Sequence, residues 1–164
     1  MRRDGLIALD SRLCRVDAWA LEAKLAEADA ALLATPGVEG LHAVGEALAL
    51  YRGRFLPADE HPTSIRLREA LHARLVRVTA EAGRRHEAAG RWEDAVACYE
   101  RALELEPGAE DLYRRLMRGY ARLGRRAEAL TLYARCRETL AALVGVLPSP
   151  ETEALGRTLG AAQA

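Results

Sequence analysis

The fold is decided by the stretch AGRWEDAVACY at residues 89–99, which the chain repeats as LGRRAEALTLY at residues 123–133. Three kinds of residue recur 34 positions apart: glycine (Gly90, Gly124), alanine (Ala95, Ala129) and tyrosine (Tyr99, Tyr133). Glycine suits a reversal between antiparallel helices because it adopts positive φ without steric cost. Alanine lets paired helices approach closely, and a tyrosine one turn later fills the gap between neighbouring pairs. The repeat therefore predicts stacked helical hairpins.

A period of 34 residues resembles that of the tetratricopeptide family. Pro107 is expected to close the first repeat, because proline cannot continue a helix. Tyr113, Leu116 and Tyr120 follow at helical spacing and predict an apolar stripe on the next helix. We interpret these tyrosines as packing residues, since no basic groove accompanies them as a base-stacking platform requires. The resemblance implies an all-α fold, a right-handed array of antiparallel helix hairpins.

A third, diverged hairpin is expected upstream of the two clear repeats. Its first helix would cover residues 17–33 and its second residues 38–54. Within the second helix, Ala47 and Tyr51 reproduce the alanine-to-tyrosine spacing of the later repeats. A loop is expected at residues 57–62, where prolines stand at both ends.

The remaining helices are expected to complete the array. A long helix should run from about residue 64 to residue 89, and the partner helix of the last hairpin from about Arg126 to Val144. A short capping helix should then begin at Pro150, with Ser149 as its N-cap. Such a cap would shield the open edge of the last repeat.

The N-terminus does not follow the repeat. Residues 5–16 contain two short apolar runs around Asp10-Ser11-Arg12, which predicts a small β-hairpin. An isolated two-stranded hairpin is marginal in water, so these strands either pack on the helices or belong to a neighbouring domain. We therefore expect two parts, a hairpin at residues 1–16 and a helical domain at residues 17–164.

The composition favours a soluble helical protein of the cytoplasm. The 24 basic and 24 acidic residues cancel, so the chain lacks the positive footprint of a nucleic-acid-binding domain. Its three cysteines are far apart and form no CxxC pair, which indicates neither a zinc site nor a disulfide framework. No apolar run approaches the roughly 20 residues that span a bilayer, so no membrane role is expected.

The residue patterns of catalysis are missing from the sequence. The four histidines lie in different segments without the i, i+4 pairing of a metal-binding helix. The sequence has neither a phosphate-binding GxxxxGK[ST] loop nor a nucleophile elbow. We therefore expect no enzyme activity, no metal and no cofactor.

Three further strings extend the resemblance over roughly residues 6–160. They are VDAW at residues 16–19, ALALYRGRFL at residues 47–56 and LVGVLPSP at residues 143–150. Together with the two repeats, they resemble the bacterial transcriptional activation domain of the Streptomyces antibiotic regulatory protein family. In that family this helical domain follows a winged-helix DNA-binding domain.

The resemblance implies a regulatory module that works by protein contacts. The N-terminal hairpin would be the tail of a winged helix whose recognition helix lies upstream, so this chain alone should bind no specific DNA sequence. Its partner would be an RNA polymerase subunit, another regulator domain or a second copy in a homodimer. A free-standing tetratricopeptide scaffold, serving a complex unrelated to transcription, is the alternative that the repeat alone allows.

A protein-binding groove is predicted where the first helices of successive hairpins line one surface. Positions four and seven apart on those helices give five arginines that would converge there: Arg77, Arg84, Arg114, Arg118 and Arg122. Guanidinium groups grip carboxylates in two places, so an acidic peptide or helix would be attracted. The alternative is a solvated face whose charge is balanced by nearby acids, namely Glu81, Glu87, Glu110 and Asp111.

Overall fold

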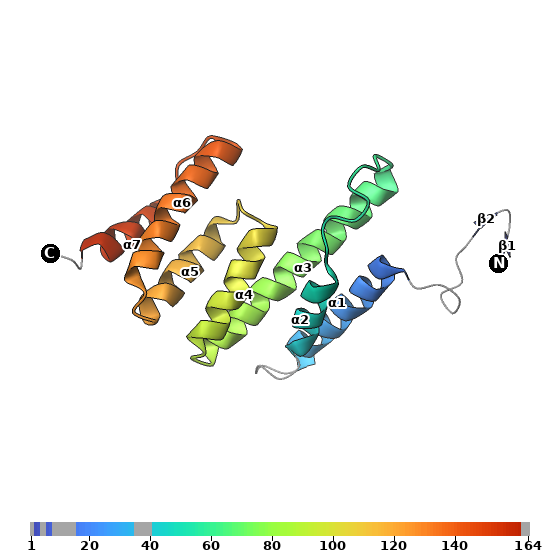
Figure 1. Cartoon of the computed structure of the whole chain (residues 1–164), viewed down its shortest axis with the longest axis horizontal. Helices are drawn as coiled ribbons and strands as arrows, with labels where there is room; N and C mark the ends of the chain where they lie inside the picture. The colour runs from blue at the N-terminus through green and yellow to red at the C-terminus, as the bar shows by residue number, and fades with distance from the viewer. Residues whose placement is uncertain (1, 4–5, 8–15, 35–40, 162–164) are drawn as a thin grey trace. The chain divides into compact units, whose positions relative to one another are not determined.

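The computed structural model describes residues 2–3, 6–7, 16–34 and 41–161. These residues form seven helices, drawn in Figure 1: α1 (Asp17–Ala34), α2 (His42–Leu50), α3 (Pro62–Ala88), α4 (Trp92–Leu105), α5 (Glu110–Arg122), α6 (Arg126–Val144) and α7 (Pro150–Ala161). The predicted all-α fold is thus confirmed. The chain divides into two compact units, the first ending at Leu75 and the second beginning at Val76 within α3.

The N-terminal hairpin is not supported as it was predicted. The structure pairs β1 (Arg2–Arg3) with β2 (Leu6–Ile7) in antiparallel register. Both strands therefore precede the turn that was expected at residues 10–12. The expected turn at residues 10–12 and most of the second strand lie outside the described residues. Two residues per strand form too small a ladder to stand for the predicted hairpin.

In the first unit, α1 and α2 pack together through small and branched apolar residues. Leu25, Ala28 and Ala47 are fully buried, as the helical spacing of the sequence predicts. The prediction that α2 continues past Tyr51 is wrong, since α2 ends at Leu50 and Tyr51 takes an extended conformation with ψ 103°. The Tyr51 hydroxyl lies 3.0 Å from Nδ1 of His72 on α3. That hydrogen bond links the residue that follows α2 to α3.

In the second unit, the two repeat glycines end their helices in the same way. Gly90 and Gly124 both have φ of 73°, a left-handed conformation that glycine adopts freely. After Gly90, the amide of Arg91 donates to the carbonyl of His86, and after Gly124 the amide of Arg125 donates to that of Tyr120. Each pattern is a Schellman motif, which closes the helix and turns the chain back.

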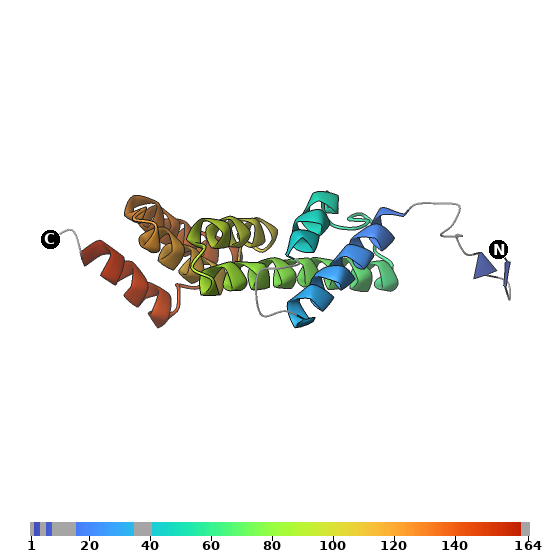
Figure 2. The ribbon, with the colours of Figure 1, turned by 90° about the horizontal axis from the view of Figure 1, so that it is seen from below.

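The predicted packing positions form the core of the second unit. Ala95 and Ala129 have no exposed surface, and Tyr99 is 1% exposed. The Tyr99 ring lies against Gly83 of α3 so closely that a Cβ on Gly83 would come within 2.5 Å of the ring. Figure 2 shows α4 lying along the C-terminal part of α3, the arrangement that this contact requires.

The C-terminal helix packs back on the last hairpin. α7 contacts both α5 and α6, and Leu159 joins the core cluster of the second unit. Tyr133 of α6 rests on Gly156 of α7, where a Cβ would lie 2.7 Å from the ring. The helix predicted at Pro150 therefore acts as the expected cap of the last repeat.

Candidate functional site

A hollow of about 290 Å³ lies in the second unit, on the side formed by the first helices of the hairpins. We call it the arginine groove and define it by its lining residues: Glu87 of α3, Trp92 of α4, Arg118, Ala121 and Arg122 of α5, and Leu155 of α7. Three helices supply most of this lining because hairpin stacking places their like faces side by side.

Arg118 and Arg122 lie one helical turn apart and therefore share a face of α5. The guanidinium of Arg122 lies over the Trp92 ring, with its carbon 5.6 Å from the ring centroid. Cation–π contact orients this side chain while leaving its N–H groups available as donors. Arg118 is exposed, and neither arginine forms an ion pair within the described part of the chain.

The acid in the arginine groove is already neutralised by other residues. Oε2 of Glu87 accepts a hydrogen bond from the Tyr99 hydroxyl at 2.6 Å and one from Nη1 of Arg115 at 3.1 Å. Arg115 thus balances Glu87, and the lining of the groove holds no further acid to balance Arg118 and Arg122. The groove consequently presents two cations beside an aromatic ring, a setting that favours carboxylates.

Of the five arginines predicted to share a groove, the structure brings Arg118 and Arg122 to this hollow and places the other three elsewhere. Arg84 pairs with Glu81 of its own helix at 2.6 Å, and neither Arg84 nor Arg77 lines the groove. Arg114 is turned into the contact between α5 and α7, where its Nη1 donates to Oγ1 of Thr152 at 3.0 Å. The sequence spacing places these residues on helix faces, but it does not show which neighbouring side chains form ion pairs or hydrogen bonds with them.

Arg114 belongs to a polar cluster that fixes the start of α7 on the start of α5. Oε1 of Glu110 accepts hydrogen bonds from the Ser149 amide at 2.8 Å, the Ser149 hydroxyl at 2.6 Å and the Thr152 hydroxyl at 2.5 Å. Arg114 adds an ion pair at 3.3 Å. We call Glu110, Arg114, Ser149 and Thr152 the α7 lock. Ser149, predicted as a helix cap, directs its hydroxyl to Glu110.

The α7 lock also controls the ionisation of Glu110. Burial alone would raise the pKa of this carboxyl, but hydrogen bonds from Ser149 and Thr152 and the charge of Arg114 outweigh it. The net effect is a pKa below the ordinary value of 4.5. Because the lock seats α7, and α7 brings Leu155 to the arginine groove, the lock supports the shape of the groove.

Sequence reasoning missed Trp92 and Leu155 as groove residues. Trp92 falls inside the quoted repeat, two positions after Gly90, so a large aromatic directly after the turn was a usable signal. No sequence pattern marks Leu155 as a groove residue, because its position in the groove depends on how α7 packs against α5 and α6.

The described residues contain neither a membrane-spanning helix nor a metal-binding cluster. No helix there has the length and apolar character needed to cross a membrane. Within residues 16–34 and 41–161, no three histidine, cysteine or acidic side chains gather as a metal site would require.

No curated protein matches the sequence significantly. Among solved structures, the chain is similar to Mycobacterium tuberculosis EmbR in complex with a low-affinity phosphopeptide, with 25% identity and a TM-score of 0.62. The match covers 96% of this chain and 41% of that one, so the present chain spans less than half of EmbR. The family model of the bacterial transcriptional activator domain matches residues 16–159, and the chain belongs to that family.

Proposed function

We propose that this domain regulates transcription by holding an acidic segment of a partner protein in the arginine groove. The supporting observation is the pair of guanidinium groups, Arg118 and Arg122, which form no ion pair with the described residues and lie beside Trp92. Each guanidinium can grip a carboxylate through two parallel hydrogen bonds. Trp92 and Leu155 would cover apolar side chains lying between those carboxylates.

The partner on this proposal is a subunit of RNA polymerase or another regulator domain. Membership of the activator-domain family favours this role over a scaffold unrelated to transcription. The domain would act by binding alone, without catalysis, because the groove offers cations and apolar surface but no nucleophile beside a base.

Binding to purified RNA polymerase tests the proposal. Replacement of Arg118→Glu together with Arg122→Glu should weaken binding at least tenfold, since charge-assisted hydrogen bonds contribute about 1.5–3 kcal/mol each. Arg101→Glu is the matched control because Arg101 is exposed on α4, outside the groove. Equal binding by the double variant and the control would exclude the groove as the contact site.

Self-association is a second candidate, supported by a different surface. The end of α6 and the following turn expose four large apolar residues in one short run: Leu143, Val144, Val146 and Leu147. Leu147 alone is 73% exposed, and clustered apolar exposure of this kind favours association. Sedimentation at increasing concentration should reveal a dimer that Leu147→Ser weakens. A monomer at all concentrations would remove this candidate.

A further inference from the structure

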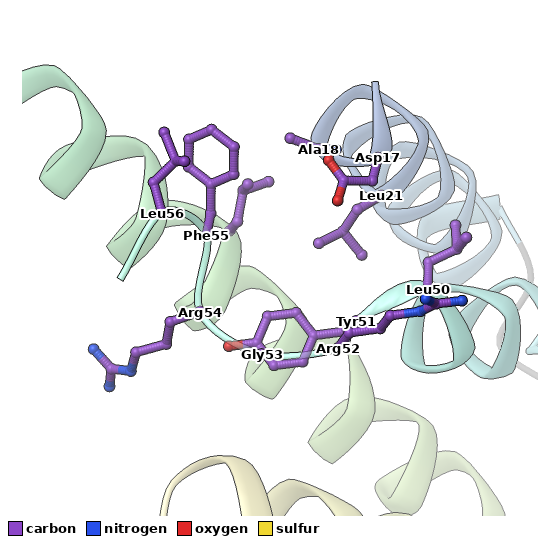
Figure 3. Close-up of a pocket in the computed structure, with 11 residues that line it drawn as sticks. Asp17, Ala18, Leu21, Leu50, Tyr51, Arg52, Gly53, Arg54, Phe55 and Leu56 are labelled. Atoms are coloured by element: carbon purple, nitrogen blue, oxygen red, sulfur yellow. Dashed lines mark hydrogen bonds between the residues drawn. The ribbon is translucent and has the colours of Figure 1, made fainter. Parts of the chain in front are cut away.

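Helix α1 is apolar on two opposite faces. One face packs in the first unit through buried residues: Ala18, Leu21, Leu25, Ala28 and Leu32. Figure 3 shows Ala18 and Leu21 projecting from α1 toward the loop that joins α2 to α3. The other face consists of exposed residues, which we call the α1 stripe: Trp19, Ala23, Ala26, Ala30 and Leu33. A surface helix normally has one apolar face, so the second face indicates a second contact.

The α1 stripe has the spacing of a seam between two packed helices. Its members follow each other in alternate steps of four and three positions, which keeps them on one face along about 21 Å of helix at about 1.5 Å per residue. At the two ends, Trp19 is 42% exposed and Leu33 is 89% exposed. Covering these side chains would release water from apolar surface, which is favourable.

The charges beside the α1 stripe are mainly acidic. Glu22 flanks the stripe on one side and Glu27 flanks it on the other. Nζ of Lys24 lies 2.8 Å from Oε2 of Glu27 and 3.1 Å from Oε2 of Glu46 on α2, so one cation serves two carboxylates. Glu22 is exposed and forms no ion pair with residues 16–34 or 41–161. The net charge beside the stripe is therefore negative, which attracts lysine and arginine.

These acids argue against a second copy of the chain as the partner. In a parallel pair of α1 helices, opposite sides of the seam meet, so Glu22 of one copy would face Glu27 of the other. In an antiparallel pair, the same sides meet, so Glu22 would face Asp29 of the other copy. Like charges that face each other destabilise a helix pair. A different protein with basic residues beside its apolar seam avoids this repulsion.

We propose that the α1 stripe binds an amphipathic helix of a second protein, with large apolar residues in its seam and lysine or arginine beside them. The large side chains would lie over Ala23, Ala26 and Ala30, where the short methyl groups leave room. The basic side chains would pair with Glu22 and Glu27. This surface lies in the first unit and attracts a basic segment, whereas the arginine groove lies in the second unit and attracts an acidic one. The two proposals are therefore independent.

Fluorescence anisotropy of a labelled peptide, titrated with the whole chain, tests this assignment. The probe is a peptide of about three heptads, with leucine at the seam positions and lysine at the flanking positions. The control probe has the same composition in scrambled order, so it keeps the charge and loses the apolar face. We expect the ordered probe to bind at least about tenfold more tightly than the scrambled one.

A substitution in the middle of the α1 stripe tests the seam. Ala26→Arg should weaken binding of the ordered probe at least about tenfold, because it places a bulky cation where the partner helix would lie. Ala97→Arg is the matched control, since Ala97 is an exposed alanine of α4 in the second unit. Circular dichroism establishes that each variant is folded.

Substitution of the flanking acids tests the charge complementarity. Glu22→Gln together with Glu27→Gln should weaken binding of the ordered probe about fivefold and reduce its dependence on salt. Glu93→Gln together with Glu138→Gln is the matched control, because it removes two exposed acids of the second unit. Binding by this control should equal that of the natural protein.

Four results would overturn the proposal. The first is no binding of the ordered probe at millimolar concentration, and the second is equally tight binding of the scrambled probe. The third is an equal loss of binding in the stripe variants and their controls. The fourth is a dimer of the chain alone, seen by sedimentation, that Ala26→Arg disperses, because a second copy would then cover the α1 stripe.

Discussion

Thr152 at the start of α7 donates its hydroxyl hydrogen to Oε1 of Glu110 at the start of α5, at 2.5 Å and across 42 positions of sequence. Thr152 has no exposed surface, so water does not compete for this bond. The bond belongs to the α7 lock, and it gives the string LVGVLPSP a physical role: Ser149 in that string directs its amide and hydroxyl to the same carboxylate.

Thr152→Val should destabilise the protein by about 1–3 kcal/mol, because it leaves the partly buried carboxylate of Glu110 short of a donor without changing side-chain shape. Thr158→Val is the control, since Thr158 is exposed on the same helix and bonds only a local carbonyl. Urea unfolding measures both. Equal stability of the two variants would contradict a stabilising role for the lock.

The contribution of Glu110 should depend on pH. Its folded pKa lies below the ordinary 4.5, so the stabilisation is complete above about pH 5 and is lost as pH falls through the folded pKa. Glu110→Gln should therefore be less stable than the natural protein at pH 7, and this difference should shrink steadily below pH 4.5. Urea midpoints from pH 7 to pH 3 measure it, and a difference independent of pH would refute the assignment.

Gly83→Ala should destabilise the second unit by about 1–3 kcal/mol, because the new methyl group would meet the Tyr99 ring at 2.5 Å in a packed core. Gly160→Ala on α7 meets nothing within 4 Å and should be neutral or slightly stabilising. Thermal unfolding compares the two variants. A harmless alanine at position 83 would show that the helices do not approach as closely as the structure has them.

The thiols of Cys98 and Cys136 should react slowly. Burial is the main cause that raises the pKa of each to about 11, and the thiolate is the reactive form. With Cys14→Ser in place, both should react with Ellman's reagent about a hundredfold more slowly at pH 8 than a free cysteine. Rapid reaction at either position would show that the core opens readily.

The repeat was predictable from sequence because its rules are local. Gly90 and Gly124 must turn the chain whatever lies around them, and Ala95 and Ala129 must fit a close helix pair. The 34-residue period was therefore enough to predict the helical hairpins of the second unit.

The groove was only partly predictable because its membership depends on distant contacts. Arg114 and Arg118 are four positions apart on one helix. Arg114 nevertheless donates a hydrogen bond to Thr152 of α7, while Arg118 lines the groove. Tyr51 shows the same limit, since the predicted helix ends before it, at Leu50, and its hydroxyl bonds to His72, 21 positions away. Neither outcome follows from spacing on a single helix.

Site-specific photo-crosslinking tests the central claim most directly. A photoreactive phenylalanine analogue at Ala121 would lie inside the arginine groove, and the same analogue at Ala134 would lie on the exposed surface of α6, outside it. With purified RNA polymerase, we predict crosslinks from position 121 to an acidic segment of one subunit and none from position 134. Crosslinks from position 134 with none from position 121 would contradict the account.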